Sequence, residues 1–460
     1  MVREIRPPGR VVGMRAHAKL AQSGPHRQQS TEPNPGAAGA IVASPRGMMD
    51  VLGRIALVAT SGYAFSVGFK VHDGIGVGWA LIEALIYGTA LGFLVAAFVV
   101  TNGWSRRLQG IVGLTLAVAI AISVSYEITV LHPGYGTDVL AFAHAGGEIL
   151  IDGDNPYQAS AGQVAQAAER FGVSLTRTAQ GGEIDWLISY PALHTLTYTA
   201  FVGLGFSDLR WGTLIVELAA LGVIWGALSP MGRLVVPLLL LVEPYLTVVF
   251  TGGGVTDWLW VLPVAISAIS LNKERYGYAG LFLGLACAVK QHPWFAVPFV
   301  VVWVARTAIG AKGMPARESI GAFFAGLVAG FVIPNLPFFI WSPSAWTQGV
   351  LSPALGNLVP DGHGLSSLLS EGLLELAPWA YSVLIAVAMA GLLAVYARFF
   401  GRMREALWVL SAVAMYFSYR SLHSYFVFWL PIAALWIDLR FVPRPFEDSG
   451  PSLQAKHGGR

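Results

Sequence analysis

Residues 132–186 read HPGYGTDVLAFAHAGGEILIDGDNPYQASAGQVAQAAERFGVSLTRTAQGGEIDW, and this polar stretch interrupts a chain that is otherwise largely apolar. Hydrophobic residues make up 55% of the 460 residues and charged residues only 12%, which is typical of integral membrane proteins. Apolar runs long enough to cross a bilayer core of about 30 Å recur from Val51 to Phe441. Because these runs do not alternate in polarity, we expect an all-α polytopic membrane protein rather than a barrel.

About twelve transmembrane helices are expected on either side of this stretch. They are placed at 54–71, 79–100, 108–131, 187–206, 209–228, 257–271, 277–290, 293–309, 319–341, 378–398, 406–418 and 423–440. The segment 234–250 is short and contains Glu243 and Pro244, so it is expected to be a re-entrant hairpin that does not cross. Arg233 fits that assignment badly, because it would lie away from the cytoplasm.

The two ends of the chain are polar. Residues 1–50 are rich in Pro, Gly, Ala and Arg, which predicts a disordered cytoplasmic tail. Residues 442–460 are expected to form a second cytoplasmic tail. Residues 51–441 would then be one transmembrane domain of a multi-pass protein of the cell membrane.

The distribution of basic residues predicts which face of the membrane carries the chemistry. Arg106 and Arg107 place the loop before the third span in the cytoplasm, so 132–186 lies outside as a small helical subdomain. Conspicuous polar residues collect on the same outer side: Asp138, Tyr190, Asp257, Lys290, His292, His363, Arg420 and His423. No nucleotide-binding motif of the GxxxxGK[ST] type is present, so an activated donor would have to arrive through the lipid.

Several short motifs carry a resemblance. They are the outer-loop Asp138 followed by a short amphipathic helix, the GDNPY turn at 153–157, YPAL at 190–193, AGLFLGLACAVKQHPWFAVP at 279–298, and a late SP…GHGL loop ending at Leu365. Together they resemble the GT-C superfamily of membrane glycosyltransferases, most closely the bacterial polyprenyl-phosphate-mannose-dependent mannosyltransferases. The resemblance covers 51–441 and implies a GT-C-like fold with 132–186 as the outer catalytic loop.

The resemblance also implies roles for particular residues. Asp138 would be the catalytic general base on an acceptor hydroxyl, while a polyprenyl-phosphate-linked sugar, mannose first, serves as the donor and an envelope glycolipid or glycan as the acceptor. The donor phosphate would be bound by Lys290, His292, Arg420 and His423. The acceptor or sugar would be bound by Tyr157, Tyr190 and His363. No cofactor and no metal are expected. Arg420 and His423 would share one helix face if the helix continues through them.

Other interpretations of these residues stay open. Asp138 could act only as a helix-capping residue, since aspartate is favoured at helix starts. Lys290 could reach the membrane interface without a chemical role. Glu148, Asp152 and Asp154 are rival acids, the last two being typical turn residues.

Two other protein classes are compatible with the sequence. Acids within apolar stretches, Glu83, Glu217 and Glu243, are typical of ion pathways, so a polytopic transporter of a small solute or a lipid-linked sugar is the main alternative. A non-catalytic scaffold is a third. Against a transporter, the sequence shows no internal repeat, and a transporter has little use for a long folded outer loop.

Overall fold

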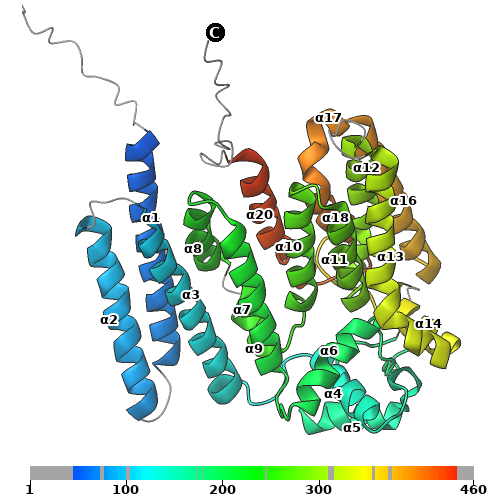
Figure 1. Ribbon diagram of the computed structural model, residues 1–460. Helices are drawn as coiled ribbons and strands as arrows, with labels where there is room; N and C mark the ends of the chain where they lie inside the picture. Colours follow the sequence, from blue (N-terminus) through cyan, green and yellow to red (C-terminus); the bar gives the residue numbers. More distant parts are fainter. Residues whose placement is uncertain are drawn as a thin grey trace, which may run out of the picture. The chain divides into compact units, whose positions relative to one another are not determined.

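The computed structural model describes residues 45–72, 77–99, 104–173, 175–179, 181–243, 246–308, 315–354, 358–370 and 376–442. These residues form an almost entirely helical protein (Figure 1). The two expected tails lie outside the described residues, except for 45–50 and Val442. Residues 45–50 are helical, so the first helix begins earlier than the sequence suggests.

The bounds of the elements follow the chain in two groups. The first group is α1 (Pro45–Val71), α2 (Val77–Val99), α3 (Arg106–Tyr126), a π-helical turn η1 (Glu127–Leu131), α4 (Asp138–Ile151), η2 (Pro156–Gln158), α5 (Ala161–Arg170), α6 (Ala192–Gly203), α7 (Arg210–Ala227), α8 (Gly232–Val242) and α9 (Val249–Gly253). The second group is α10 (Trp258–Asn272), α11 (Tyr276–Val289), η4 (His292–Phe295), α12 (Val297–Ala308), α13 (Ala316–Trp341), α14 (Pro343–Leu351), η5 (Ser352–Ala354), β1 (Asp361–Gly362), α15 (Leu365–Ser370), α16 (Pro378–Arg398), α17 (Phe400–Met403), η6 (Arg404–Ala406), α18 (Leu407–Met415), β2 (Arg420–Ser421), α19 (Ser424–Val427) and α20 (Leu430–Phe441).

Many of these helices are suited to a membrane. Among the described residues, seven helical segments are long and apolar enough to cross one: Met48–Val71, Gly78–Val99, Arg106–Leu131, Arg210–Ala227, Ala316–Trp341, Trp379–Arg398 and Ser424–Phe441. Three shorter apolar helices are α8, α10 and α11. The expectation of an all-α membrane protein is therefore confirmed at this level.

Hydrogen bonds identify which helix ends lie together in the first half of the chain. The indole Nε1 of Trp104, just before α3, donates to the carbonyl of Pro230 at 2.8 Å. The Arg233 Nη1, at the start of α8, donates to Gln109 Oε1 at 2.8 Å. The start of α3, the end of α7 and the start of α8 therefore share one end of the helix bundle.

The opposite end is held by Arg210, the first residue of α7, whose side chain is fully buried. Its Nη1 donates to the carbonyls of His132 at 2.6 Å and Gly134 at 3.0 Å, which follow α3. It also donates to the carbonyl of Gly252, in α9, at 2.9 Å. Consequently α7 runs from the end at Arg210 to the end at Arg233. Helix α8 begins at the Arg233 end, and α9 lies at the Arg210 end.

The structure bears on two of the topological expectations. Helix α6 has 12 residues, about 18 Å of helix. It lies against α4, where Gly146 and Gly147 approach Thr195 and Thr199 closely. Helix α6, within the expected crossing at 187–206, thus packs along α4, whereas the start of α8 and α9, at the two ends of the segment expected not to cross, lie at opposite ends of the bundle.

Helices α4, α5 and α6 make up a small helical subdomain (residues 138–203), in which α4 and α5 come from the polar stretch 132–186 and α6 from the segment expected to cross the membrane (Figure 1). Thr137 caps α4 by accepting from the backbone N–H of Val139. Ser160 and Gln163 form a reciprocal capping box at the start of α5. Beside this subdomain, the short strands β1 and β2 pair in parallel and bring residues 361–362 against 420–421.

A glycine-lined crossing joins α11 and α13. A Cβ added to Gly284 would lie 2.2 Å from the carbonyl oxygen of Leu327, and one added to Gly330 would lie 2.2 Å from that of Leu281. The two backbones therefore touch, in the small-residue packing that membrane helices favour. This contact fixes α11, which ends immediately before Lys290.

Candidate functional site

A cavity of about 190 Å³ lies where the α4–α6 subdomain meets the ends of α11, α16 and α18. Five of the eight predicted site residues line it: Asp138, Tyr190, Lys290, His292 and Arg420. They come from four separate parts of the chain, so the expected meeting of an acid with basic side chains does occur in the structure.

Asp138 is the first helical residue of α4 and is fully buried. Its carboxylate accepts from the backbone N–H of Thr176 at 2.6 Å and from the Thr176 hydroxyl at 2.9 Å. The N-cap itself is Thr137, so the carboxylate is not occupied by capping. Its place in the first turn still favours negative charge, because the positive end of the helix dipole is there.

Lys290 follows the last residue of α11 and is 4% exposed. Its ammonium donates to both carboxylate oxygens of Asp257, at 2.9 and 2.8 Å, and Asp257 is 0% exposed. The rings of Tyr190 and Tyr425 flank the ammonium at 5.4 and 5.6 Å. The charge of Lys290 is therefore already balanced within the protein, which the sequence did not predict.

His292 belongs to the same cluster. Its Nδ1 lies 3.4 Å from Asp257 Oδ1, and its ring packs on Tyr425 with centroids 3.9 Å apart. Burial, helped by the nearby Lys290 ammonium, lowers the pKa of His292 to about 4. The imidazole is therefore neutral at pH 7 and contributes polarity rather than charge.

Two guanidinium groups line the cavity, and among the described residues Arg420 makes fewer hydrogen bonds than Arg177. It lies in strand β2, and its Nη1 donates to the carbonyl of Thr176 at 2.9 Å. The nearest carboxylate oxygen, Asp361 Oδ2, is 3.7 Å from Nη2. A guanidinium carries five N–H donors, and the hydrogen bond to Thr176 uses a single one of them.

Three predicted residues do not line this cavity. His423 and His363 lie beside one another, with ring centroids 5.8 Å apart, and His423 Nε2 is 3.7 Å from Glu243 Oε1. The expectation that Arg420 and His423 share a helix face is wrong, because Arg420 is in a strand and α19 begins only after His423. The third, Tyr157, is buried and donates from its hydroxyl to the carbonyl of Tyr190 at 2.7 Å, which positions the backbone of Tyr190.

The rival acids have other partners. Glu148 Oε2 is 2.9 Å from Arg170 Nη2, on the surface of the subdomain. Asp152 is the C-cap residue of α4, and Asp154 is exposed in the turn that follows. None of the three lines the cavity, so Asp138 is the one carboxylate among its lining residues, and Asp257 lies behind it as the partner of Lys290.

Sequence reasoning missed three side chains here. Asp257 was recognised as polar but received no role, because its partner Lys290 is 33 residues away in the chain. Thr176 carries no signal in the sequence. Arg177, also in the lining, is paired with Asp185 and donates to Ser189 Oγ at 2.9 Å, which fastens the subdomain's last loop.

The described residues contain no group of three or more His, Cys, Asp or Glu side chains that could hold a metal ion. The cavity offers an acid, a guanidinium and aromatic faces to a ligand. Comparisons of the chain with protein families, with curated proteins and with solved structures find no match.

Proposed function

We propose that the protein is a membrane glycosyltransferase that moves a monosaccharide, mannose first, from a polyprenyl-phosphate carrier to a hydroxyl of an envelope glycolipid or glycan. The observation that carries the proposal is the shared cavity of Asp138, Tyr190, Lys290, His292 and Arg420. A buried carboxylate near an under-used guanidinium suits a reaction in which a hydroxyl loses a proton and a phosphate leaves.

The proposed topology has twelve passes and a GT-C-like arrangement. The passes are α1, α2, α3, α7, α8 with α9, α10, α11, α12, α13, α16, α18, and α19 with α20. In this scheme Arg106, Arg107 and Arg233 all lie on the cytoplasmic side, as the positive-inside rule requires. The cavity then faces the non-cytoplasmic side of the cell membrane, where a lipid-linked donor is accessible.

In the proposed reaction Asp138 removes the proton from the acceptor hydroxyl. The acceptor oxygen forms a bond to the anomeric carbon as the bond from that carbon to the phosphate oxygen breaks, and polyprenyl phosphate leaves. A single displacement inverts the configuration at the anomeric carbon. A positioned general base of this kind typically contributes about 10²–10⁴-fold to the rate.

Arg420 is the proposed principal ligand of the leaving phosphate. Its guanidinium can grip two phosphate oxygens through parallel N–H donors. Lys290 would contribute as part of its pair with Asp257, and the Tyr190 ring would flank the sugar. His363 and His423, which lie together outside the cavity lining, are proposed to contact the donor or acceptor only beyond the reacting atoms.

The test is sugar transfer by the purified protein. It would be incubated with labelled polyprenyl-phosphate-mannose, and separately with the arabinose analogue, together with a glycolipid acceptor. Asp138→Asn should lower the transfer rate at least about 100-fold, because asparagine cannot accept the proton. Asp154→Asn, which alters an exposed acid of the same loop, is the matched control and should leave the rate unchanged. Undiminished transfer by Asp138→Asn would remove Asp138 from its role.

One observation favours the alternative, a transporter of a small solute or lipid-linked sugar. Glu217, in the middle of α7, is fully buried, and its Oε2 accepts from the Thr251 hydroxyl at 2.6 Å. Its Oε1 has no hydrogen-bond partner in the described part of the chain. Buried acids in membrane helices often lie on ion pathways. Counterflow of a solute in proteoliposomes that Glu217→Gln abolishes, with no new glycosidic bond formed, would favour this function.

A further inference from the structure

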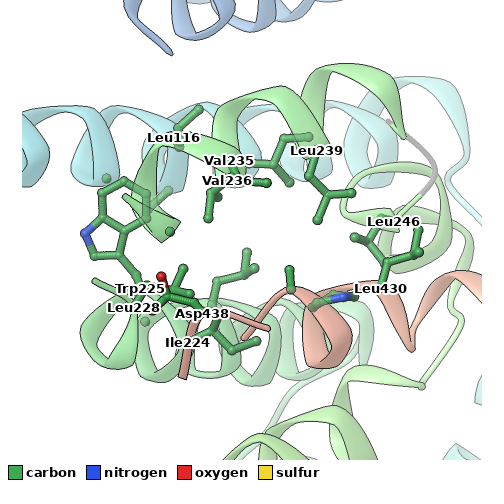
Figure 2. A pocket seen from close by; sticks show the side chains of 18 of the residues that line it. Leu116, Ile224, Trp225, Leu228, Val235, Val236, Leu239, Leu246, Leu430 and Asp438 are labelled. Carbon is green, nitrogen blue, oxygen red and sulfur yellow. The ribbon is translucent and has the colours of Figure 1, made fainter. Parts of the chain in front are cut away.

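A second cavity lies apart from the candidate site. It has a volume of about 690 Å³ and lies between α3, α7, α8 and α20 (Figure 2). Figure 2 shows it as an elongated space with Trp225, Leu228 and Asp438 at one end and Leu246 and Leu430 at the other. It shares no lining residue with the candidate site.

The lining is almost wholly hydrocarbon. Asp438 is its one ionisable side chain, and its carboxylate is engaged, accepting from the backbone N–H of Ser229 at 2.7 Å and from the Ser229 hydroxyl at 2.5 Å. An apolar space of this size does not suit water, which needs two to four polar partners. It falls in the range of volumes that hold small-molecule ligands, about 300–1,000 Å³.

The depth of the cavity matches one leaflet of a bilayer. On α3 its lining runs from Gly110 to Ile120, and on α7 from Leu218 to Leu228. Ten residues of helix rise about 15 Å, and half of a hydrocarbon core of about 30 Å is the same length. A chain lying along these helices would therefore extend from one membrane surface to the midplane.

The cavity opens sideways, onto the outer surface of the helix bundle. Four of its lining residues are partly exposed on the outer surface: Leu114 by 68%, Ile437 by 55%, Val235 by 49% and Leu430 by 41%. In a protein embedded in a membrane these side chains face lipid. A lipid chain can therefore enter between the helices from the side.

An unpaired cation marks one end. Gly110, Gly113 and Ala117 of α3 line the cavity, and Arg106 precedes them by four, seven and eleven residues, which places it on the same helix face. Its side chain is exposed and has no hydrogen-bond or ion-pair partner among the described residues. Arg107 is one residue, or about 100°, further round the helix. The structure therefore places a positive charge in line with the end of an apolar channel.

We propose that this cavity binds one phospholipid of the membrane, with an acyl chain between α3, α7, α8 and α20 and the phosphate on Arg106. Basic residues at the membrane surface beside pockets between helices are a recurring way of holding lipid head groups. The inference does not depend on the proposed function, because it concerns a separate cavity at the opposite ends of α3 and α7.

The test uses the full-length protein in detergent, titrated with dioleoyl phosphatidylglycerol and observed by native mass spectrometry. Gly222 lines the cavity and has open space where a Cβ would be, so the ring of Gly222→Phe should occupy the channel. Gly226, one turn along α7, is equally open but does not line the cavity, so Gly226→Phe is the matched control. Arg106→Gln, with Arg107→Gln as its control, tests the phosphate contact on an exposed surface where folding is not at risk.

The wild type should retain one phospholipid per chain. Gly222→Phe should weaken retention at least tenfold and Arg106→Gln about tenfold, while both control variants behave like the wild type. Equal retention by Gly222→Phe and the wild type would overturn the proposal. So would displacement of the phospholipid by polyprenyl phosphate at a lower concentration than its own, since that would identify a different occupant.

Discussion

Replacing Asp257 by asparagine should destabilise the protein strongly, because it leaves the Lys290 ammonium buried without a counter-charge. Both side chains are almost completely buried, and the wild type joins them by contacts of 2.9 and 2.8 Å. Breaking a buried pair from one side typically costs about 3–5 kcal/mol of unfolding free energy. Asparagine keeps an oxygen that can accept from Trp260, so we expect a loss near the lower limit, about 3 kcal/mol.

The assay is unfolding of the purified protein in mixed micelles with increasing denaturing detergent. Asp361→Asn is the matched control, because that carboxylate is half exposed and 3.7 Å from Arg420. Exposed pairs are worth less than about 1 kcal/mol. If Asp257→Asn costs no more than Asp361→Asn, the assignment of a buried ion pair that holds the site together is refuted.

A double variant separates stability from chemistry at this pair. Asp257→Asn combined with Lys290→Met removes both charges and should recover most of the lost unfolding free energy, since an apolar replacement of a buried pair is often neutral. Sugar transfer should stay low in the double variant if Lys290 takes part in donor binding. Recovery of transfer together with stability would assign Lys290 a purely structural role.

Two further predictions concern packing and pH. A Cβ at Gly284 would lie 2.2 Å from the Leu327 carbonyl oxygen, so Gly284→Ala should lower the unfolding free energy by more than about 2 kcal/mol. A Cβ at Gly321 meets nothing within 4 Å, so Gly321→Ala is the control and should leave the unfolding free energy unchanged or slightly raised. Comparable losses in the two variants would contradict the close crossing of α11 and α13. Because the pKa of His292 falls from 6.5 to about 4 on folding, the unfolded chain binds more protons between these values. Stability should therefore decline as the pH drops from 6.5 towards 4, and His292→Gln should reduce that decline by up to about 1.4 kcal/mol per pH unit; an unchanged pH profile would argue against a neutral, buried imidazole.

The sequence predicts the helices well because burial in lipid imposes a continuous apolar run that can be recognised locally. Every expected crossing contains a helix, and the polar loop contains helices α4 and α5. The packing of 187–206 and 234–250 could not be predicted in this way. Both are apolar, and their difference is tertiary: α6 packs along α4, and Arg210 binds the carbonyls of His132 and Gly252.

The candidate site, too, could be predicted from the sequence only in part. Asp138, Lys290 and Arg420 stand out in the sequence because charges beside apolar runs are rare. Their partners do not stand out, since Thr176 and Asp257 become relevant only through contacts between distant segments. The strand that carries Arg420 also depends on such a contact, because β2 exists only through its pairing with β1.

The backbone of Thr176 contacts both of the opposite charges of the site. Its N–H donates to Asp138 Oδ2 at 2.6 Å, while its carbonyl accepts from Arg420 Nη1 at 2.9 Å. The carboxylate and the guanidinium are thus each held by the backbone of one residue, and no ion pair between them is found among the described residues. Asp361, with Oδ2 3.7 Å from Nη2, is the carboxylate that lies beside the guanidinium. An incoming anionic molecule would therefore meet a guanidinium whose hydrogen bond goes to a neutral carbonyl and whose nearest carboxylate is half exposed.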